Sequence, residues 1–340
     1  MLMRRIVMIF GVLSFASCAD AHSVQPALVA SNPVVLQSDQ SPDGGAWLRY
    51  PVPTRHAGLW GITDGGRSGL WFTEQSADKV GHITLSGAIK EYALGFDHAP
   101  NNIVMGADGK LYISDGSFPD IIIVTQSGHV HYLDLPPGGG RAWGISRGVD
   151  GNVWYMDGSR IGRITPAGQI TVYTTPAQEE FPTGAVVQTP DGMVWFADEF
   201  NQMIGKLDPT TGNVVEYPIN APAFCLPGSI AYSHEGDLWF TCEVREMIGH
   251  MATSGVVLGY VNTHVFAQWP NSIVDGPDGG IWEVGRWEAD LAHISPTGHL
   301  VKHLAPPGFK GSGVSIAAGA DGNMWYTDSR SNVIGVYVRH

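Results

Sequence analysis

The chain has 340 residues, of which 44% are hydrophobic and only 15% are charged, and its formal net charge is −13. Nucleic-acid backbones attract Lys and Arg, so this balance excludes a nucleic acid as the expected partner. The 44 glycines and 22 prolines favour short strands joined by tight turns over helices.

The first 21 residues have the pattern of an export signal. A basic start, MLMRR, precedes the apolar run IVMIFGVL, which is too short to span a membrane. Two processing sites remain open: residues 15–18 (FASC) resemble a bacterial lipobox, and residues 19–21 (ADA) fit the small-x-small rule of ordinary signal peptidase. We therefore expect an exported protein, either periplasmic or held in the bacterial envelope by a lipid anchor on Cys18.

Residues 22–45 are rich in Ser, Pro and Gln, a composition typical of a linker. No later stretch has this composition. We therefore expect one domain over residues 46–340, present as a monomer.

A unit of 41 to 44 residues then repeats along the domain. The repeat is anchored by one aromatic residue per unit: Trp71, Tyr112, Trp154, Trp195, Trp239, Trp282 and Trp325. A fixed period in this range with four short strands per period is typical of the blade of a β-propeller.

Within each unit the predicted elements follow one order. A short apolar strand such as residues 58–63 (GLWGIT) comes first, followed by a turn such as Asp108-Gly109 in which Gly supplies the positive φ. The aromatic strand is second, and its ring is expected to fill the wedge between neighbouring blades. A strand with an Ile-Gly pair such as Ile204-Gly205 is third, and an outer strand such as residues 88–94 (AIKEYAL) is fourth.

The seventh unit ends at the C-terminus without its outer strand, while residues 46–51 (AWLRYP) form an outer strand ahead of the first unit. Pairing the two would close the ring and remove its exposed edges. The sequence therefore predicts an all-β, seven-bladed β-propeller of four-stranded blades, closed by the N-terminal strand.

Carboxylates follow the aromatic strand in most units, and this topology brings them to one mouth of the central channel. Such side chains suit a Mg²⁺ or Ca²⁺ ion or acid–base chemistry, although Asp at the end of a strand also bonds neighbouring backbone amides. We predict a metal site among Glu74, Asp115, Asp157 and Asp198, and a catalytic role for Asp328. His98, in the loop FDHAPNN on the same side, is the candidate base, with a solvated loop histidine as the alternative.

The starts of the first strands contribute aromatic and amide side chains to the same mouth. Trp60, Asn101, Trp143 and Asn271 suit a ligand with ring surface and with carbonyl or hydroxyl groups. For the two tryptophans, packing between blades is the alternative.

Cys225 and Cys242 flank two neighbouring strands of the fifth unit. One precedes the first strand and the other ends the second, so antiparallel pairing places them within reach of a disulfide. We predict this bond.

Residues 70–92 (LWFTEQSADKVGHITLSGAIKEY) resemble the repeat of the virginiamycin B (streptogramin B) lyases, and the resemblance extends over residues 46–340. It implies elimination at the ester of a cyclic depsipeptide, in which a His removes the proton α to the carbonyl and Mg²⁺ near a Glu stabilises negative charge. The positions of the family's His residues are held here by Asn271 and Val314, neither of which accepts a proton near neutral pH. Ser312 corresponds to the family's Glu, and Asp328 to its acidic residue after the last aromatic.

Three functional hypotheses follow. The leading one is a streptogramin-lyase-like propeller that binds a small molecule, cyclic peptide or glycan at the channel mouth and, if catalytic, acts as a metal-assisted C–O lyase. The second is a non-enzymatic envelope protein whose propeller face binds a protein or glycan. The third is a calcium-dependent lactonase of the regucalcin kind, a family that normally has six blades.

Overall fold

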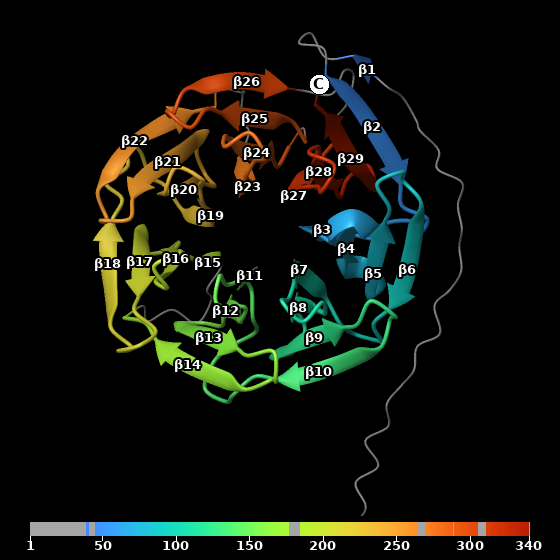
Figure 1. Cartoon of the computed structure of the whole chain (residues 1–340), viewed down its shortest axis with the longest axis horizontal. Helices are drawn as coiled ribbons and strands as arrows, with labels where there is room; N and C mark the ends of the chain where they lie inside the picture. The colour runs from blue at the N-terminus through green and yellow to red at the C-terminus, as the bar shows by residue number, and fades with distance from the viewer. Residues whose placement is uncertain are drawn as a thin grey trace, which may run out of the picture.

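The computed structural model describes residues 39–40, 45–176, 184–263, 269–287, 289–304 and 311–339. The predicted signal segment 1–21 lies outside these residues, as does most of the predicted linker. The described chain forms seven sheets set radially about a central channel (Figure 1), so the predicted seven-bladed fold is confirmed. Its only helical turns are η1 (Gly66–Ser68) and η2 (Gln75–Ala77), and no helix in the described part is long and apolar enough to cross a membrane.

The first four blades follow the chain from inner to outer strand. Blade one consists of β3 (Leu59–Asp64), β4 (Leu70–Glu74), β5 (Lys79–Ile83) and β6 (Ile89–Ala93). Blade two consists of β7 (Pro100–Met105), β8 (Leu111–Asp115), β9 (Asp120–Val124) and β10 (Val130–Asp134). Blade three consists of β11 (Ile145–Arg147), β12 (Val153–Met156), β13 (Arg160–Ile164) and β14 (Ile170–Thr174). Blade four consists of β15 (Val186–Gln188), β16 (Val194–Asp198), β17 (Met203–Leu207) and β18 (Val214–Pro218).

The remaining blades keep this order until the chain ends. Blade five consists of β19 (Pro227–Tyr232), β20 (Asp237–Cys242), β21 (Met247–Ala252) and β22 (Val257–Asn262). Blade six consists of β23 (Pro270–Asp275), β24 (Ile281–Gly285), β25 (Leu291–Ile294) and β26 (Leu300–Leu304). Blade seven consists of β27 (Gly313–Ala318), β28 (Met324–Asp328), β29 (Val333–Val338) and the N-terminal strand β2 (Ala46–Pro51).

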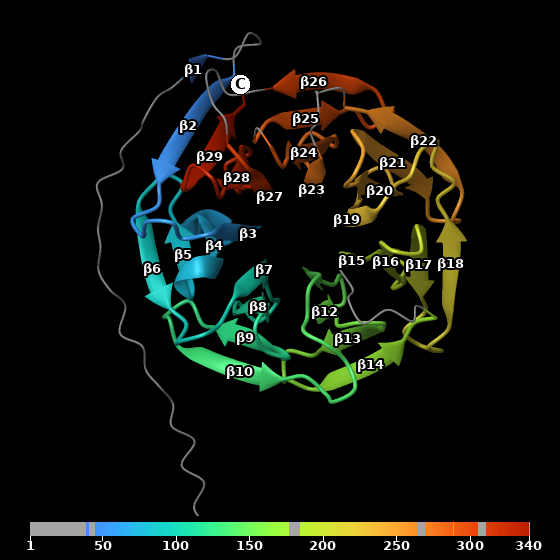
Figure 2. The same cartoon turned by 180° about the vertical axis from the view of Figure 1, so that it is seen from behind.

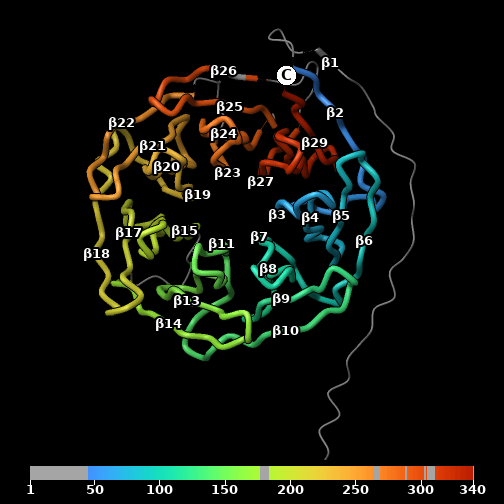
Figure 3. Tube along the Cα trace, viewed as in Figure 1, coloured from blue at the N-terminus to red at the C-terminus, as the bar shows by residue number. Residues whose placement is uncertain are grey.

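The ring is closed by antiparallel pairing of β2 with β29, in the register Ala46↔Val338 to Pro51↔Val333. The two strands lie side by side from either face of the ring (Figures 2 and 3). The short strand β1 (Asp39–Gln40) extends this sheet outside β2. Asn332 holds the segment that follows β2, because its Nδ2 donates to the carbonyls of Val52 at 3.1 Å and Thr54 at 2.9 Å. The predicted closure by the N-terminal strand is confirmed.

The repeated aromatic residue packs each blade against the next. Trp71 lies in one buried cluster with side chains of blade two, and Trp154 lies in another with side chains of blade four. Trp325 closes the series, since it packs with Phe72 of blade one. Each large ring therefore fills the space that widens outward between two radial sheets.

The Ile-Gly pair of the third strand is explained by a close approach. In blade four, Phe196 of β16 lies over Gly205 of β17, and a Cβ at Gly205 would lie 2.0 Å from Cζ of the ring. The same arrangement joins Gly249 to Phe240 in blade five. A side chain larger than hydrogen at this position would displace a fully buried ring.

Candidate functional site

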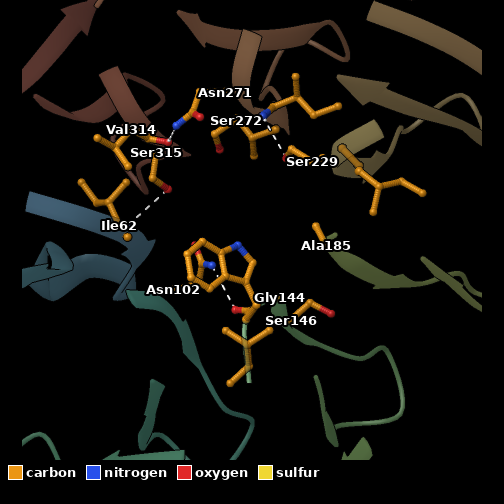
Figure 4. Close-up of a pocket in the computed structure, with 18 of the residues that line it drawn as sticks. Ile62, Asn102, Gly144, Ser146, Ala185, Ser229, Asn271, Ser272, Val314 and Ser315 are labelled. Atoms are coloured by element: carbon orange, nitrogen blue, oxygen red, sulfur yellow. Dashed lines mark hydrogen bonds between the residues drawn. The ribbon is translucent and has the colours of Figure 1, made fainter. Parts of the chain in front are cut away.

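The loops that join second to third strands, and those that lead from one blade to the next, meet at one face of the propeller. We call this the mouth face; residues 94–99 and 116–119 are two of its loops. A central cavity of about 790 Å³ opens among the first strands and reaches this face. Figure 4 shows residues of all seven blades around it.

Each blade contributes one small or amide residue to the wall of the cavity. These residues, one from each blade, lie within the first strand or just before it: Gly61, Asn102, Gly144, Ala185, Ser229, Ser272 and Ser315. Hydroxyl groups of the second strands hold neighbouring blades together behind this wall, since Thr327 Oγ1 donates to the Trp60 carbonyl at 2.6 Å. The small wall residues leave open space for a ligand where seven inner strands converge.

Trp60 and Trp143 form the aromatic side of the cavity. Both line it, and their ring centroids are 5.8 Å apart at an interplanar angle of 83°. The rings come from blades one and three, and Asn102 of blade two lies near them, with its Nδ2 donating to the Trp143 carbonyl at 3.0 Å. The two indoles therefore meet across the inner strand of blade two.

The two predicted asparagines differ in position. Asn271 lines the cavity, and its Nδ2 donates to the Val314 carbonyl. Asn101 is fully buried, and its side-chain oxygen accepts a hydrogen bond from Gln75 Nε2 instead. The next residue, Asn102, takes the cavity position because successive side chains of a strand point to opposite sides.

The five predicted carboxylates are buried and do not line the cavity; these are Glu74, Asp115, Asp157, Asp198 and Asp328. Most of them bond to groups of their own loops. Asp157 pairs with Arg160, whose Nε donates to it at 3.0 Å, and Asp328 accepts the backbone N–H of Ser312 at 2.8 Å. Asp198 accepts from Asn201 Nδ2 at 2.9 Å. The structure therefore does not bring them together as one ligand set around the channel.

His98 and Asp115 are brought together, although not at the channel. His98 Nδ1 hydrogen-bonds to Asp115 Oδ2, while Asp115 Oδ1 accepts the backbone N–H groups of Ala99 at 3.0 Å and Ser117 at 2.7 Å. The imidazole is held in the loop before β7, and the cavity is lined by other residues. His98 therefore lies away from a ligand in the cavity.

Three of the charged residues that line the cavity each come directly after the second strand of their blade, and a fourth, Asp275, ends the inner strand β23. Glu199, Glu243 and Arg286 line it in blades four, five and six. Burial raises the pKa of Glu243 to about 7, with a further increase from the charge of Glu199 and a decrease from Arg286. Burial also raises the pKa of Glu199. None of these three is among the site residues predicted from the sequence, although the alignment of blades places Glu243 and Arg286 directly after the aromatic strand.

The cavity mouth is therefore divided by chemistry. Blades one and three contribute the indoles of Trp60 and Trp143, and blades four to six contribute two carboxylates and a guanidinium. Such a site can hold an apolar ring surface against one wall and a reacting polar group against the other.

Exposed aromatic residues surround this mouth. Every exposed Phe and Trp among the described residues lies in a mouth-face loop: Phe96, Phe118, Phe200, Phe224, Trp269 and Trp287. Trp269 and Trp287 also pack edge to face, with centroids 5.9 Å apart. The aromatic surface of the site thus extends beyond the cavity itself.

Cys225 and Cys242 are joined by a disulfide, with their Cα atoms 4.7 Å apart. The bond ties the segment that enters β19 to the end of β20, next to the cavity residue Glu243. A cross-link of this kind restricts the unfolded chain and fixes the local backbone.

The model of the virginiamycin B lyase family matches residues 40–222 and 176–339, which together cover the propeller. A virginiamycin B lyase of Nocardia farcinica (strain IFM 10152) is 29% identical over 137 residues, or 40% of this chain. That alignment spans 48% of the relative, about half its length.

Two solved structures share the fold over most of their length. A streptogramin B lyase structure superposes with a TM-score of 0.79 and 24% identity, covering 86% of this chain and 96% of the other. A catalytically inactive variant of the virginiamycin B lyase from Staphylococcus aureus, with quinupristin, gives a TM-score of 0.78 and 23% identity, covering 86% and 99%. At these identities the likeness shows a common fold.

Proposed function

Because this chain belongs to the virginiamycin B lyase family, we propose that its central cavity binds a cyclic peptide or similar small molecule and opens it by elimination at a C–O bond. The observation that carries this proposal is the divided cavity mouth. Its aromatic pair, Trp60 and Trp143, supports binding of a ring surface, and Glu243 supports proton removal on the opposite side.

Glu243 is the proposed base because the positions of the family's histidines are held by Asn271 and Val314. A pKa of about 7 lets a substantial fraction of the carboxyl be ionised at neutral pH while it still accepts a proton effectively. In the proposed step Glu243 takes the proton α to a carbonyl, a C=C bond forms, and the C–O bond at the β-carbon breaks to release a carboxylate. No water is added, so the opened product has the mass of the ring.

Arg286 is the proposed stabiliser of the negative charge that develops on the carbonyl oxygen. It lines the same cavity, and its charge lowers the pKa of Glu243. A fixed guanidinium acts strongly on developing charge in a site shielded from water.

The family's Mg²⁺ position does not fit the residues present. Ser312 stands where the resemblance places a Glu, so this position lacks one carboxylate; Asp328 Oδ1 accepts the N–H groups of Ser312 at 2.8 Å and Ser331 at 3.1 Å, and only its Oδ2 has no partner among the described residues. We therefore assign no step of the reaction to a metal at this position.

Quinupristin is the probe for this proposal, monitored by liquid chromatography and mass spectrometry. We expect the wild-type protein to produce a species of unchanged mass and new retention, at a rate that rises with pH through about 7 as Glu243 loses its proton. Glu243→Gln should bind the probe but reduce conversion by about 100-fold or more.

Variants of the aromatic wall supply the binding control. Trp143→Ala should weaken binding by about tenfold, since it removes one aromatic contact of roughly 1 kcal/mol and its buried area. A hydrolysed product carrying one additional water, or full activity in Glu243→Gln, would contradict the mechanism. Binding without conversion by the wild-type protein would favour the non-enzymatic binding function.

The proposal also places the protein outside the cytoplasm. The Cys225–Cys242 disulfide supports this, because such bonds persist in oxidising compartments. Mass spectrometry of the mature N-terminus decides the processing: an acylated Cys18 indicates a lipid anchor, and a free His22 indicates ordinary signal peptidase.

A further inference from the structure

A second cluster of potential ligands lies on the mouth face, between the first two blades and outside the cavity. One ligand atom of each of His98, Asp115 and Asp120 lies within 4.8 Å of the others. His98 comes from the loop before β7, Asp115 ends β8 and Asp120 begins β9. The three residues form the one such group of His, Cys and carboxylate side chains in the part of the chain that the structure describes.

Blade three has a positively charged side chain at the position that Asp120 holds in blade two. There Asp157 follows the second strand as Asp115 does, but the third strand begins with Arg160, which donates to Asp157 from Nε at 3.0 Å. In blade two the third strand begins with Asp120, so a second carboxylate replaces the guanidinium. The repeat therefore places two negative side chains where its neighbour has an ion pair.

The environment of Asp120 points to a missing positive partner. Its side chain is buried, with 7% of the residue exposed, and its Oδ1 has no hydrogen-bond partner among the described residues. A buried carboxylate of this kind is costly unless a proton or a cation neutralises it.

The imidazole of His98 is held for ligation by its neighbours. It stacks on Tyr132, with centroids 4.6 Å apart and an interplanar angle of 4°, and Phe118 packs on it edge to face at 5.3 Å. The Tyr132 hydroxyl in turn donates to the Leu94 carbonyl. Contacts behind a ligand that fix its orientation are typical of metal sites in proteins.

The geometry points to a binding site for a divalent transition metal, best suited to Zn²⁺, formed by His98, Asp115 and Asp120. One imidazole nitrogen and two carboxylates favour Zn²⁺ over Mg²⁺ and Ca²⁺, which prefer oxygen ligands alone. The ion would take the place that the Arg160 guanidinium holds in blade three. It would tie the loop before β7 to the second and third strands of blade two, and it is independent of the ligand cavity.

Calorimetric titration of Zn²⁺ into the chelator-treated protein tests this site. We expect one tight equivalent per chain in the wild type, and Mg²⁺ and Ca²⁺ should not compete for it. The isosteric variant Asp120→Asn should lose at least about tenfold in affinity for that equivalent. Added Zn²⁺ should raise the melting temperature of the wild type but not of the variant.

His234→Gln is the matched control, because the exposed His234 also pairs with a carboxylate, Asp275, but the pair belongs to no group of three potential ligands among the described residues. This variant should bind Zn²⁺ as the wild type does. The visible absorption of bound Co²⁺ gives a second readout, which reports the coordination geometry of the site, and it should change or be lost in His98→Gln. A wild type with no tight equivalent, or an Asp120→Asn variant that binds like the wild type, would overturn the proposal.

Discussion

Glu74 shows how one buried side chain shapes the behaviour of the whole domain. It is fully buried at the end of β4, and neither carboxylate oxygen has a hydrogen-bond partner among the described residues. Burial raises its pKa to about 8, the charge of Glu91 adds to this, and Lys79 lowers it. We therefore expect most of the Glu74 carboxyl to be protonated at neutral pH.

This protonation predicts a loss of stability as the pH rises. The folded protein binds the proton of Glu74 more tightly than the unfolded chain does, so stability is greatest below about pH 4.5 for this group and falls until about pH 8. Glu74→Gln removes the titration. It should reduce the fall in the free energy of unfolding between pH 5 and pH 8 by on the order of 3 kcal/mol.

Urea unfolding of both proteins at a series of pH values measures this difference. A second variant, Glu235→Gln in an exposed turn, should follow the wild-type pH profile. Parallel profiles for the wild type and Glu74→Gln would show that the carboxyl is ionised in the folded state.

The sequence predicted which loops and strand ends contribute to the cavity, but not always which side chain of each faces it. The repeat identified the segment of Asn101 and the segment of Asp198, yet the cavity residues are Asn102 and Glu199. Adjacent residues at the end of a strand point in different directions, and the turn that follows sets which one faces the channel. Those backbone angles are not readable from residue type alone.

At the scale of the element, the third strand depends on a residue without a side chain. A Cβ at Gly205 would lie 2.0 Å from the ring of Phe196, which is fully buried. Gly205→Ala should therefore lower the free energy of unfolding by about 1–3 kcal/mol, because the ring has no space into which to move.

Gly259→Ala is the matched comparison. It places the same substitution in β22, where no atom lies within 4 Å of the added Cβ. Urea unfolding should show little or no loss of stability there. Equal losses for the two variants would contradict this explanation, because only Gly205 lies against the ring of Phe196.

Elements were the part of the fold that the sequence predicted best. The period, the Asp-Gly turns and the aromatic strand recur in every blade or nearly so, and seven repetitions make a weak local signal strong. Gly322, in the turn of blade seven, has the positive φ of 78° that the Asp-Gly pair predicts.

At the scale of the whole molecule, stability depends on the antiparallel pairing of β2 with β29, which closes the propeller. Trp47 of β2 is almost fully buried, with ring centroids 5.1 Å from Tyr337 and 6.0 Å from Tyr326. Trp47→Ala should lower the free energy of unfolding by about 3–5 kcal/mol, as for other large rings removed from cores. A loss below 1 kcal/mol in urea unfolding would show that the stability of the propeller does not depend on β2.

Closure was predictable because the seventh unit lacks a strand that an orphan segment at the start can supply. The cavity was less predictable, because its size depends on how far the seven inner strands lie from the central axis. No local sequence pattern indicates that distance. The contrast between aromatic and charged sides becomes visible only when blades one, three, four, five and six are placed around one channel.

A crystal structure of the Glu243→Gln variant with quinupristin tests the central claim most directly, since this variant should hold the probe without converting it. We expect density for the probe in the central cavity, with a ring against Trp60 and Trp143 and an ester facing residue 243. Density outside the cavity, or an empty cavity at a saturating concentration of the probe, would contradict it.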